Sequence, residues 1–259
     1  SGLGSSHHAG RRPRCLGMGG PCLLRPEGGA PATLGPACTD NFQTAPFLFD
    51  GLLFQSVEQC YQAMKFTDPA LREKIRKVER KAKENDSAYG VRIWQAAHSR
   101  PTARRRDDFE AVKLEIMYLA MKAKYTQHPE QQAELLATGP ALIEGGPSTI
   151  WKDSRGRQHR WQDWNGRIQM RIRAELQPPE ARPPGQLESL EAEFARYMAE
   201  EGGAAAPLPG RPEEFDLGAG AGGLGGAGGG PSGPEEEEEA GDSGEQGQGR
   251  AATTGEAPS

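Results

Sequence analysis

Three polar side chains in one short segment could carry out chemistry together. Glu58, Gln62 and Lys65 lie in the sequence QSVEQCYQAMKF, residues 55–66. A helix over this segment would place them at positions i, i+4 and i+7, and therefore on one face. A carboxylate, an amide and an ammonium group in one row can bind a polar ligand and move a proton. The same row could instead be a solvated helix face, because polar stripes are ordinary on amphipathic helices.

The flanking sequence predicts how this row is held in place. Ser56 is a suitable N-cap for the helix. Upstream, apolar residues flank an Asp-Gly pair in the stretch 47–54, which favours a β-hairpin. Glu58 would then begin a helix that leaves the edge of a sheet, a common place for a catalytic side chain.

Helical spacing predicts the elements that surround this helix. A proline after Asp68 indicates a new helix start, and the charged stretch 70–84 is typical of a surface helix. Apolar residues recur with helical spacing over four turns from Phe109. We expect a single compact α+β domain, predominantly helical, with a small sheet from residues 41–54 and 141–151.

Four sequence blocks resemble, in order, those of the NADAR family, which is also called YbiA-like. SVEQCYQAMKF, residues 56–66, matches the family pattern S-x-E-x-x-Y/F-Q-A-x-K-F. The helix from Phe109 matches a second block, residues 135–144 match a helix that turns into a strand, and Trp151 with Asp153 match a W-G-D-G block. The resemblance implies a YbiA-like fold and an N-glycosidase activity.

The resemblance spans roughly residues 40–176, and three of its departures bear on function. Asn41-Phe42 matches the first family block, but the aromatic-Tyr-Ser sequence that usually precedes it has no counterpart. Phe109 replaces a tryptophan, which keeps an aromatic face but removes the indole N–H donor. Lys152 replaces a glycine, so the loop is expected to differ in shape. These departures leave open a non-catalytic module that binds ADP-ribose or NAD-like ligands.

The resemblance implies hydrolysis of a C–N glycosidic bond. Relatives act on phosphoribosylamino-pyrimidine intermediates of riboflavin biosynthesis, or on ADP-ribose linked to guanine, so ADP-ribosylated nucleic acid is a further expected partner. Such cleavage passes through an oxocarbenium-like state. Glu58 is the first candidate to stabilise that cation and activate water, with Asp153 as the second carboxylate. The candidate substrate-binding residues are Asn41, Phe42, Gln62, Lys65, Phe109, Trp151 and Arg155.

These candidates divide by chemistry. Phe109 and Trp151 are candidate stacking rings, although Phe109 could equally be a core anchor. Lys65, Arg155 and Arg157 are candidate phosphate contacts, although the basic loop that contains the two arginines could equally be a mobile surface loop. Trp94, outside the matched motifs, is interpreted as a core residue.

Charge is unevenly distributed along the 259 residues, behind a net charge of −5. Residues 40–176 carry 23 Lys and Arg against 18 Asp and Glu, whereas residues 177–259 carry 4 Arg and 17 acids. A basic centre suits an anionic ligand such as a phosphorylated nucleoside. A third alternative is an interaction protein that uses the basic domain and the acidic tail.

Composition divides the chain into three segments. Residues 1–38 are rich in Gly, Pro and Arg and are expected to be disordered, because they bury too little apolar surface to offset an ordering cost of roughly 1–2 kcal/mol per residue. Residues 39–177 form the expected domain. Residues 178–259 form a low-complexity acidic tail, in which residues 186–201 could form a short helix that docks on the domain or binds a partner.

The sequence indicates neither a metal nor a cofactor nor a membrane anchor. Cys15, Cys22, Cys38 and Cys60 include no C-x-x-C pair, so we expect free thiols in a reducing compartment. No apolar run is long enough for a transmembrane helix, and we expect no signal peptide in the given residues, because the arginines at 11–14 are not followed by an apolar core. We expect an intracellular protein of the cytoplasm or nucleus, and an organelle transit peptide stays open.

Overall fold

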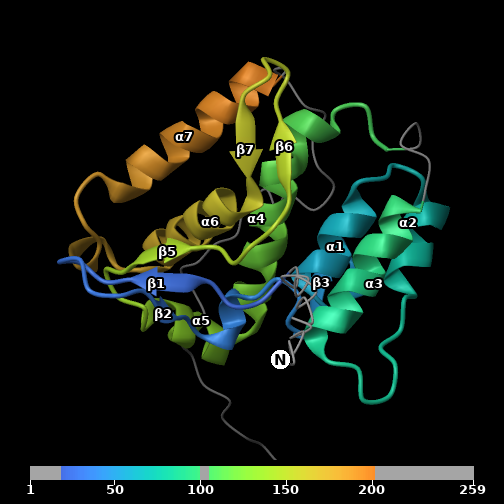
Figure 1. Ribbon diagram of the computed structural model, residues 1–259, viewed down its shortest axis with the longest axis horizontal. Coiled ribbons are helices and arrows are strands. Elements are labelled where there is room, and N and C mark those ends of the chain that lie inside the picture. The colour runs from blue at the N-terminus through green and yellow to red at the C-terminus, as the bar shows by residue number, and fades with distance from the viewer. Residues whose placement is uncertain (1–18, 100–104, 202–259) are drawn as a thin grey trace, which may run out of the picture. The chain divides into compact units, whose positions relative to one another are not determined.

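The computed structural model describes residues 19–99 and 105–201 (Figure 1). The helices are α1 (Val57–Met64), α2 (Pro69–Arg76), α3 (Asp86–His98), α4 (Phe109–Gln127), α5 (Pro129–Leu136), α6 (Trp161–Leu176) and α7 (Gln186–Glu201). The strands are β1 (Leu23–Arg25), β2 (Thr33–Leu34), β3 (Phe47–Phe49), β4 (Leu52–Phe54), β5 (Leu142–Glu144), β6 (Ile150–Lys152) and β7 (Gln158–Arg160). The prediction of a predominantly helical α+β fold is confirmed.

Helix α4 is the element against which many of the others pack. Figure 1 shows it near the middle of the molecule, and it contacts α1 as well as α5, α6 and α7. Its apolar residues are buried at helical spacing from Phe109 to Tyr125, as the sequence predicted. Side chains from α1 and α4 can therefore face one common space.

The strands form three separate small sheets, which corrects the single sheet expected from residues 41–54 and 141–151. Strand β5 pairs with β1, which in turn pairs with β2. The other two sheets are the antiparallel hairpins β3–β4 and β6–β7. The predicted hairpin at the Asp-Gly pair is confirmed: Asp50 and Gly51 have φ values of 52° and 70°, as a type I′ turn requires.

Residues 19–38 are part of the folded domain, so the expectation of disorder up to residue 38 is wrong there; residues 1–18 lie outside the described part. Cys22 and Cys38 are buried, and the Cys22 backbone N–H donates to Thr39 Oγ1 at 2.8 Å. Strand β1 pairs on one side with β2 and on the other with β5, which lies more than a hundred residues later in the sequence. Local composition cannot predict such a partner, because strand formation depends on distant pairing.

Helix α1 is buried along its whole length. Ser56 Oγ accepts a hydrogen bond from the Gln59 backbone N–H at 3.2 Å, which confirms the predicted N-cap. Asp68 caps α2 as predicted, but α2 ends at Arg76 and not near residue 84. The Gln59 side chain donates to the carbonyls of Ile75 and Arg76 at 3.3 and 3.0 Å, which satisfies groups that the helix end leaves free.

Helix α7 forms where the sequence allowed a short helix, and it extends the domain beyond residue 177. Leu190, Phe194 and Tyr197 are buried, and the helix contacts both α4 and α6. Phe194 packs edge-on against Trp164 with ring centroids 5.3 Å apart. The expected acidic tail from residue 202 onward lies outside the described residues. Of the helices described, none is both long and apolar enough to cross a bilayer.

Candidate functional site

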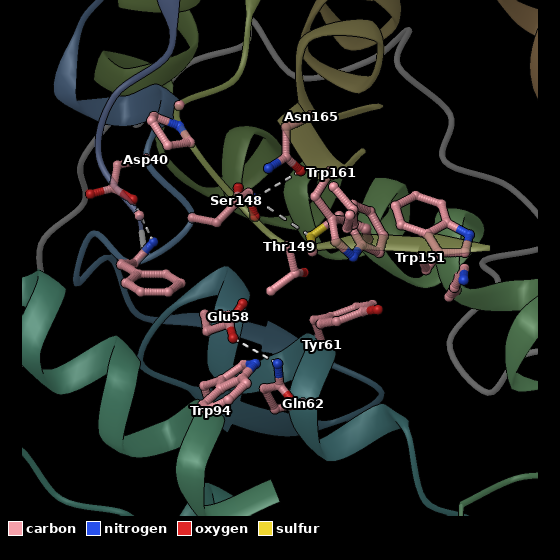
Figure 2. A pocket seen from close by; sticks show the side chains of 18 of the residues that line it. Asp40, Glu58, Tyr61, Gln62, Trp94, Ser148, Thr149, Trp151, Trp161 and Asn165 are labelled. Atoms are coloured by element: carbon pink, nitrogen blue, oxygen red, sulfur yellow. Dashed lines mark hydrogen bonds between the residues drawn. The ribbon is translucent and has the colours of Figure 1, made fainter. Parts of the chain in front are cut away.

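A cavity of about 360 Å³ lies against α1, α3 and α4 and is closed on another side by residues 146–151. Figure 2 shows Glu58, Gln62 and Tyr61 of α1 on one side of the cavity, with Ser148 and Thr149 on the opposite side. This volume is in the range of small-molecule sites. Seven of the nine predicted site residues line it, namely Asn41, Phe42, Glu58, Gln62, Lys65, Phe109 and Trp151.

The polar row of α1 forms one wall of the cavity. Gln62 Nε2 donates to Glu58 Oε1 at 2.7 Å, and both side chains are buried. Lys65 follows on the same face, with Nζ lying 5.0 Å from the centre of the Tyr61 ring and 5.6 Å from that of Phe109. The row is therefore a cavity wall, and the alternative of a solvated helix face does not apply.

Burial sets the electrostatics of the two charged groups in this row. Loss of water contact raises the pKa of Glu58 to about 7, although attraction by Lys65 opposes the shift. Loss of water contact likewise lowers the pKa of Lys65 to about 8, with Glu58 opposing and Arg105 adding to the shift. A carboxyl group with a pKa near 7 can both accept and donate a proton at neutral pH.

Two amide oxygens at the cavity are buried without a partner among the described residues. They are Gln62 Oε1 and Asn41 Oδ1. Each amide nitrogen is engaged: that of Gln62 with Glu58, and that of Asn41 with Asn165 Oδ1 at 3.2 Å. Buried acceptors are rarely left unpaired, so these two oxygens suit the hydroxyl or N–H groups of a ligand.

Aromatic rings line much of the cavity. The Trp161 ring packs edge-on against Tyr61, with ring centroids 5.3 Å apart, and its centroid lies 4.9 Å from that of Trp151. Trp94, predicted as a core residue, is only partly buried and lines the cavity. Its ring stacks on His98 at 3.9 Å. Such faces can stack on a base or cover a sugar.

Cations also gather at the cavity. Lys113 is 3% exposed, and its Nζ lies 4.1 Å above the Trp151 ring while it pairs with Glu110 at 2.5 Å. Arg105 lies over the Phe109 ring at 5.4 Å. Together with Lys65 they bring three basic side chains to the cavity, which suits a phosphorylated ligand.

The structure places the predicted catalytic residue Asp153 outside the cavity, next to the β6–β7 turn. Its Oδ1 accepts from the backbone N–H groups of Arg155 and Arg157 at 3.0 and 2.8 Å. Its Oδ2 pairs with Arg157 Nε at 2.6 Å and with His159 at 3.0 Å. The carboxylate of Asp153, predicted as the second catalytic carboxylate, therefore stabilises the hairpin and does not line the cavity.

Arg155 is also outside the cavity. Its side chain is 59% exposed and pairs with Glu200 of α7 at 3.5 Å. The predicted basic loop is largely the β6–β7 hairpin, in which Arg155 and Arg157 form ion pairs with carboxylates of this chain. Arg155, predicted as a phosphate contact, therefore does not line the cavity.

Sequence reasoning missed several cavity residues, although some lie inside the matched motifs. Tyr61 and Lys113 stand in two of those motifs, and Asp40 directly precedes Asn41-Phe42. Asp40 Oδ1 accepts from the Phe42 backbone N–H at 2.9 Å, and burial raises its pKa. Within the described residues, no group of three His, Cys, Asp or Glu could hold a metal ion.

Fold and cavity together define a helix-rich α+β domain with a cavity built on a buried glutamate. The NADAR domain matches residues 34–177, more than half of the chain, and the chain belongs to this family.

Three curated relatives are similar to parts of this chain. N-glycosidase YbiA of Escherichia coli (strain K12) is 36% identical over 103 residues, which cover 40% of this chain and 58% of the relative. Riboflavin biosynthesis protein PYRR, chloroplastic, of Zea mays is 28% identical over 131 residues, 49% of this chain and 20% of the relative. Riboflavin biosynthesis protein VVA0006 of Vibrio vulnificus (strain YJ016) is 29% identical over 139 residues, 53% of this chain and 35% of the relative.

Among solved structures, the NMR structure of Escherichia coli YbiA is 29% identical, with a TM-score of 0.42, and the match covers 54% of this chain and 77% of that one. The chain spans 58% or less of the length of the three curated relatives named above.

Proposed function

We propose that this protein is an N-glycosidase that hydrolyses the C–N bond between a phosphorylated ribose and a base. The observation that carries the proposal is Glu58, a buried carboxyl group at the cavity wall whose pKa is raised to about 7. Support also comes from a relative named as an N-glycosidase. The substrates proposed are a phosphoribosylamino-pyrimidine or ADP-ribosylated guanine, free or in nucleic acid.

Glu58 performs the proton transfers in the proposed reaction. The C–N bond breaks, the base nitrogen keeps the bonding pair, and the ribose carbon becomes oxocarbenium-like. The Glu58 carboxylate stabilises this cation and takes a proton from the attacking water, whose oxygen forms the new bond to carbon. The same proton then passes to the base nitrogen, so water is divided between the two products and Glu58 returns to its ionised form.

The remaining side chains bind and orient the substrate. The unpaired oxygens of Asn41 and Gln62 accept hydrogen bonds from ribose hydroxyls or base N–H groups. Trp151 and Phe109 offer aromatic faces to the base. Lys65 and Lys113 lie on the side of the cavity where the phosphate binds.

The test is hydrolysis of both proposed substrates in water enriched in oxygen-18, with free base and ribose product followed by chromatography and mass spectrometry. Wild type should release base and place one heavy oxygen on the ribose carbon. Glu58→Gln should not release base, whereas Glu130→Gln, which changes an exposed glutamate in α5, should retain full activity. Equal release by wild type and Glu58→Gln would overturn the proposal.

A non-catalytic ADP-ribose or NAD-derivative binding module is the second candidate. It is favoured by the Glu58–Gln62 hydrogen bond, which occupies one carboxylate oxygen, and by phenylalanine at position 109. This candidate predicts saturable ADP-ribose binding without turnover, and affinity that changes little in Glu58→Gln. Calorimetry on wild type and Glu58→Gln measures the binding, and the base-release assay measures the turnover that separates this candidate from the glycosidase.

A further inference from the structure

We propose that Tyr197 and the last turn of α7 position the cavity wall that carries Trp151, so that the site extends beyond the NADAR match. The match ends at residue 177, before α7 begins at Gln186. The inference concerns the shape of the cavity and holds whether the ligand is hydrolysed or only bound. Its consequence for turnover rests on the proposed function.

The Tyr197 hydroxyl joins two walls of the cavity. It accepts a hydrogen bond from Trp151 Nε1 at 3.1 Å and donates one to the Glu110 carbonyl at 3.3 Å. Trp151 comes from β6 and Glu110 from α4, and both line the cavity, whereas Tyr197 does not. Tyr197 is only 3% exposed. It is therefore a buried link behind the wall and a positioning residue rather than a catalytic one.

The wall needs such a link because β6 has little support of its own. Within the described residues, β6 pairs with β7 alone, and an isolated two-stranded hairpin is marginally stable in water. Figure 1 shows the C-terminal end of α7 next to the turn of this hairpin. The hairpin therefore needs packing from another element to hold Trp151 in one place.

Two glutamates at the end of α7 hold the hairpin turn. Glu201 accepts hydrogen bonds from the Ser154 backbone N–H at 3.2 and 3.1 Å. Glu200 pairs with Arg157 and, at 3.5 Å, with Arg155. These contacts hold the turn of the hairpin, whereas Tyr197 binds Trp151 in strand β6. Helix α7 therefore contacts the hairpin at two points.

A displaced Trp151 would alter the cavity beyond its own ring. Lys113 Nζ lies 4.1 Å above that ring, and Trp161 lies 4.9 Å from it. Loss of the Tyr197 hydroxyl would thus loosen an aromatic face and a buried cation together. We expect weaker ligand binding, by about three- to tenfold, which is the loss expected for one buried hydrogen bond.

The test uses the full chain labelled with nitrogen-15, with the indole N–H resonances followed by NMR. Trp151→Phe assigns the Trp151 signal. Tyr197→Phe removes only the hydroxyl, and should shift that signal and speed its hydrogen exchange about tenfold while the Trp94 signal is unchanged. Tyr89→Phe is the matched control. Tyr89 lies in α3, and its hydroxyl donates to the Val78 carbonyl at 2.7 Å. Removal of this hydroxyl should leave the Trp151 signal unchanged.

Calorimetry with ADP-ribose on the same proteins gives the binding readout. Tyr197→Phe should bind more weakly, as should the double variant Glu200→Gln, Glu201→Gln, at unchanged stoichiometry. An unshifted Trp151 signal in Tyr197→Phe, or unchanged affinity in both variants, would overturn the inference. If the signal shifts and affinity falls but wild type releases no base, the inference stands and the glycosidase proposal fails.

Discussion

The buried charge of Glu58 should reduce folding stability, and Glu58→Gln should recover it in a pH-dependent way. Folding raises the pKa of this group from 4.5 to about 7, so the folded state holds a proton that the unfolded state has lost between those values. The free energy of unfolding therefore falls as pH rises through this window, and the loss reaches its full size above pH 7. At about 1.4 kcal/mol per pH unit, the reduction reaches about 3 kcal/mol. This pKa already includes the attraction of Lys65.

Glutamine has nearly the same shape as glutamate and no charge to desolvate. We therefore expect Glu58→Gln to be more stable than wild type by up to about 3 kcal/mol at pH 8, with the difference shrinking toward zero near pH 4.5. Urea unfolding at pH 5, 6, 7 and 8 measures the difference. Glu130→Gln, on the surface, should differ from wild type by less than about 0.5 kcal/mol throughout.

This reasoning would be refuted if the difference in free energy of unfolding between wild type and Glu58→Gln did not vary with pH. A Glu58→Gln protein that is less stable than wild type at pH 8 would refute it as well. Either result would mean that Glu58 is paired or hydrated well enough to be charged in the folded state, and that its pKa is close to that of an exposed glutamate.

Three further predictions follow from contacts at or near the cavity. Gly166→Ala should lower the free energy of unfolding by at least about 2 kcal/mol in denaturant titrations, because its Cβ would lie 2.1 Å from the Ile143 carbonyl oxygen. Gly90→Ala should weaken ADP-ribose binding in calorimetry, because the new Cβ would lie 2.3 Å from the ring of Phe42, which lines the cavity. Unchanged affinity would show that displacement of this ring does not affect binding. Lys113→Met should weaken ADP-ribose binding about tenfold and make it less dependent on salt, and an unchanged salt dependence would place the phosphate elsewhere.

The sequence predicted the α1 wall well because that part depends on local rules. The spacing of Glu58, Gln62 and Lys65 follows from helix geometry, and Ser56 and the Asp-Gly turn fix the boundaries of their elements through hydrogen bonds to near neighbours. Once a helix forms, these three side chains share a face. Their burial could be inferred only from the family resemblance.

Features that depend on distant partners could not be predicted in the same way. Strand β1 has a composition that favours disorder and is ordered by β5. Tyr197 lies beyond the matched region, and its hydroxyl binds Trp151 across 46 residues. For β1 and Tyr197 the deciding partner is distant in the sequence, so no local rule identifies it. Asp153 is a different case: it stands in a matched motif, but hydrogen bonds to near neighbours turn its carboxylate into the hairpin.

The most direct test of the central claim is the rate of base release by Glu58→Gln at pH 8, measured in single turnover with the enzyme in saturating excess over the substrate. At this pH the variant is predicted to be at least as stable as wild type, so lost activity cannot be attributed to unfolding. We predict release at least about a hundredfold slower than wild type, as expected for loss of a general acid–base group. Release at the wild-type rate would contradict the assignment of Glu58 as the group that performs the chemistry.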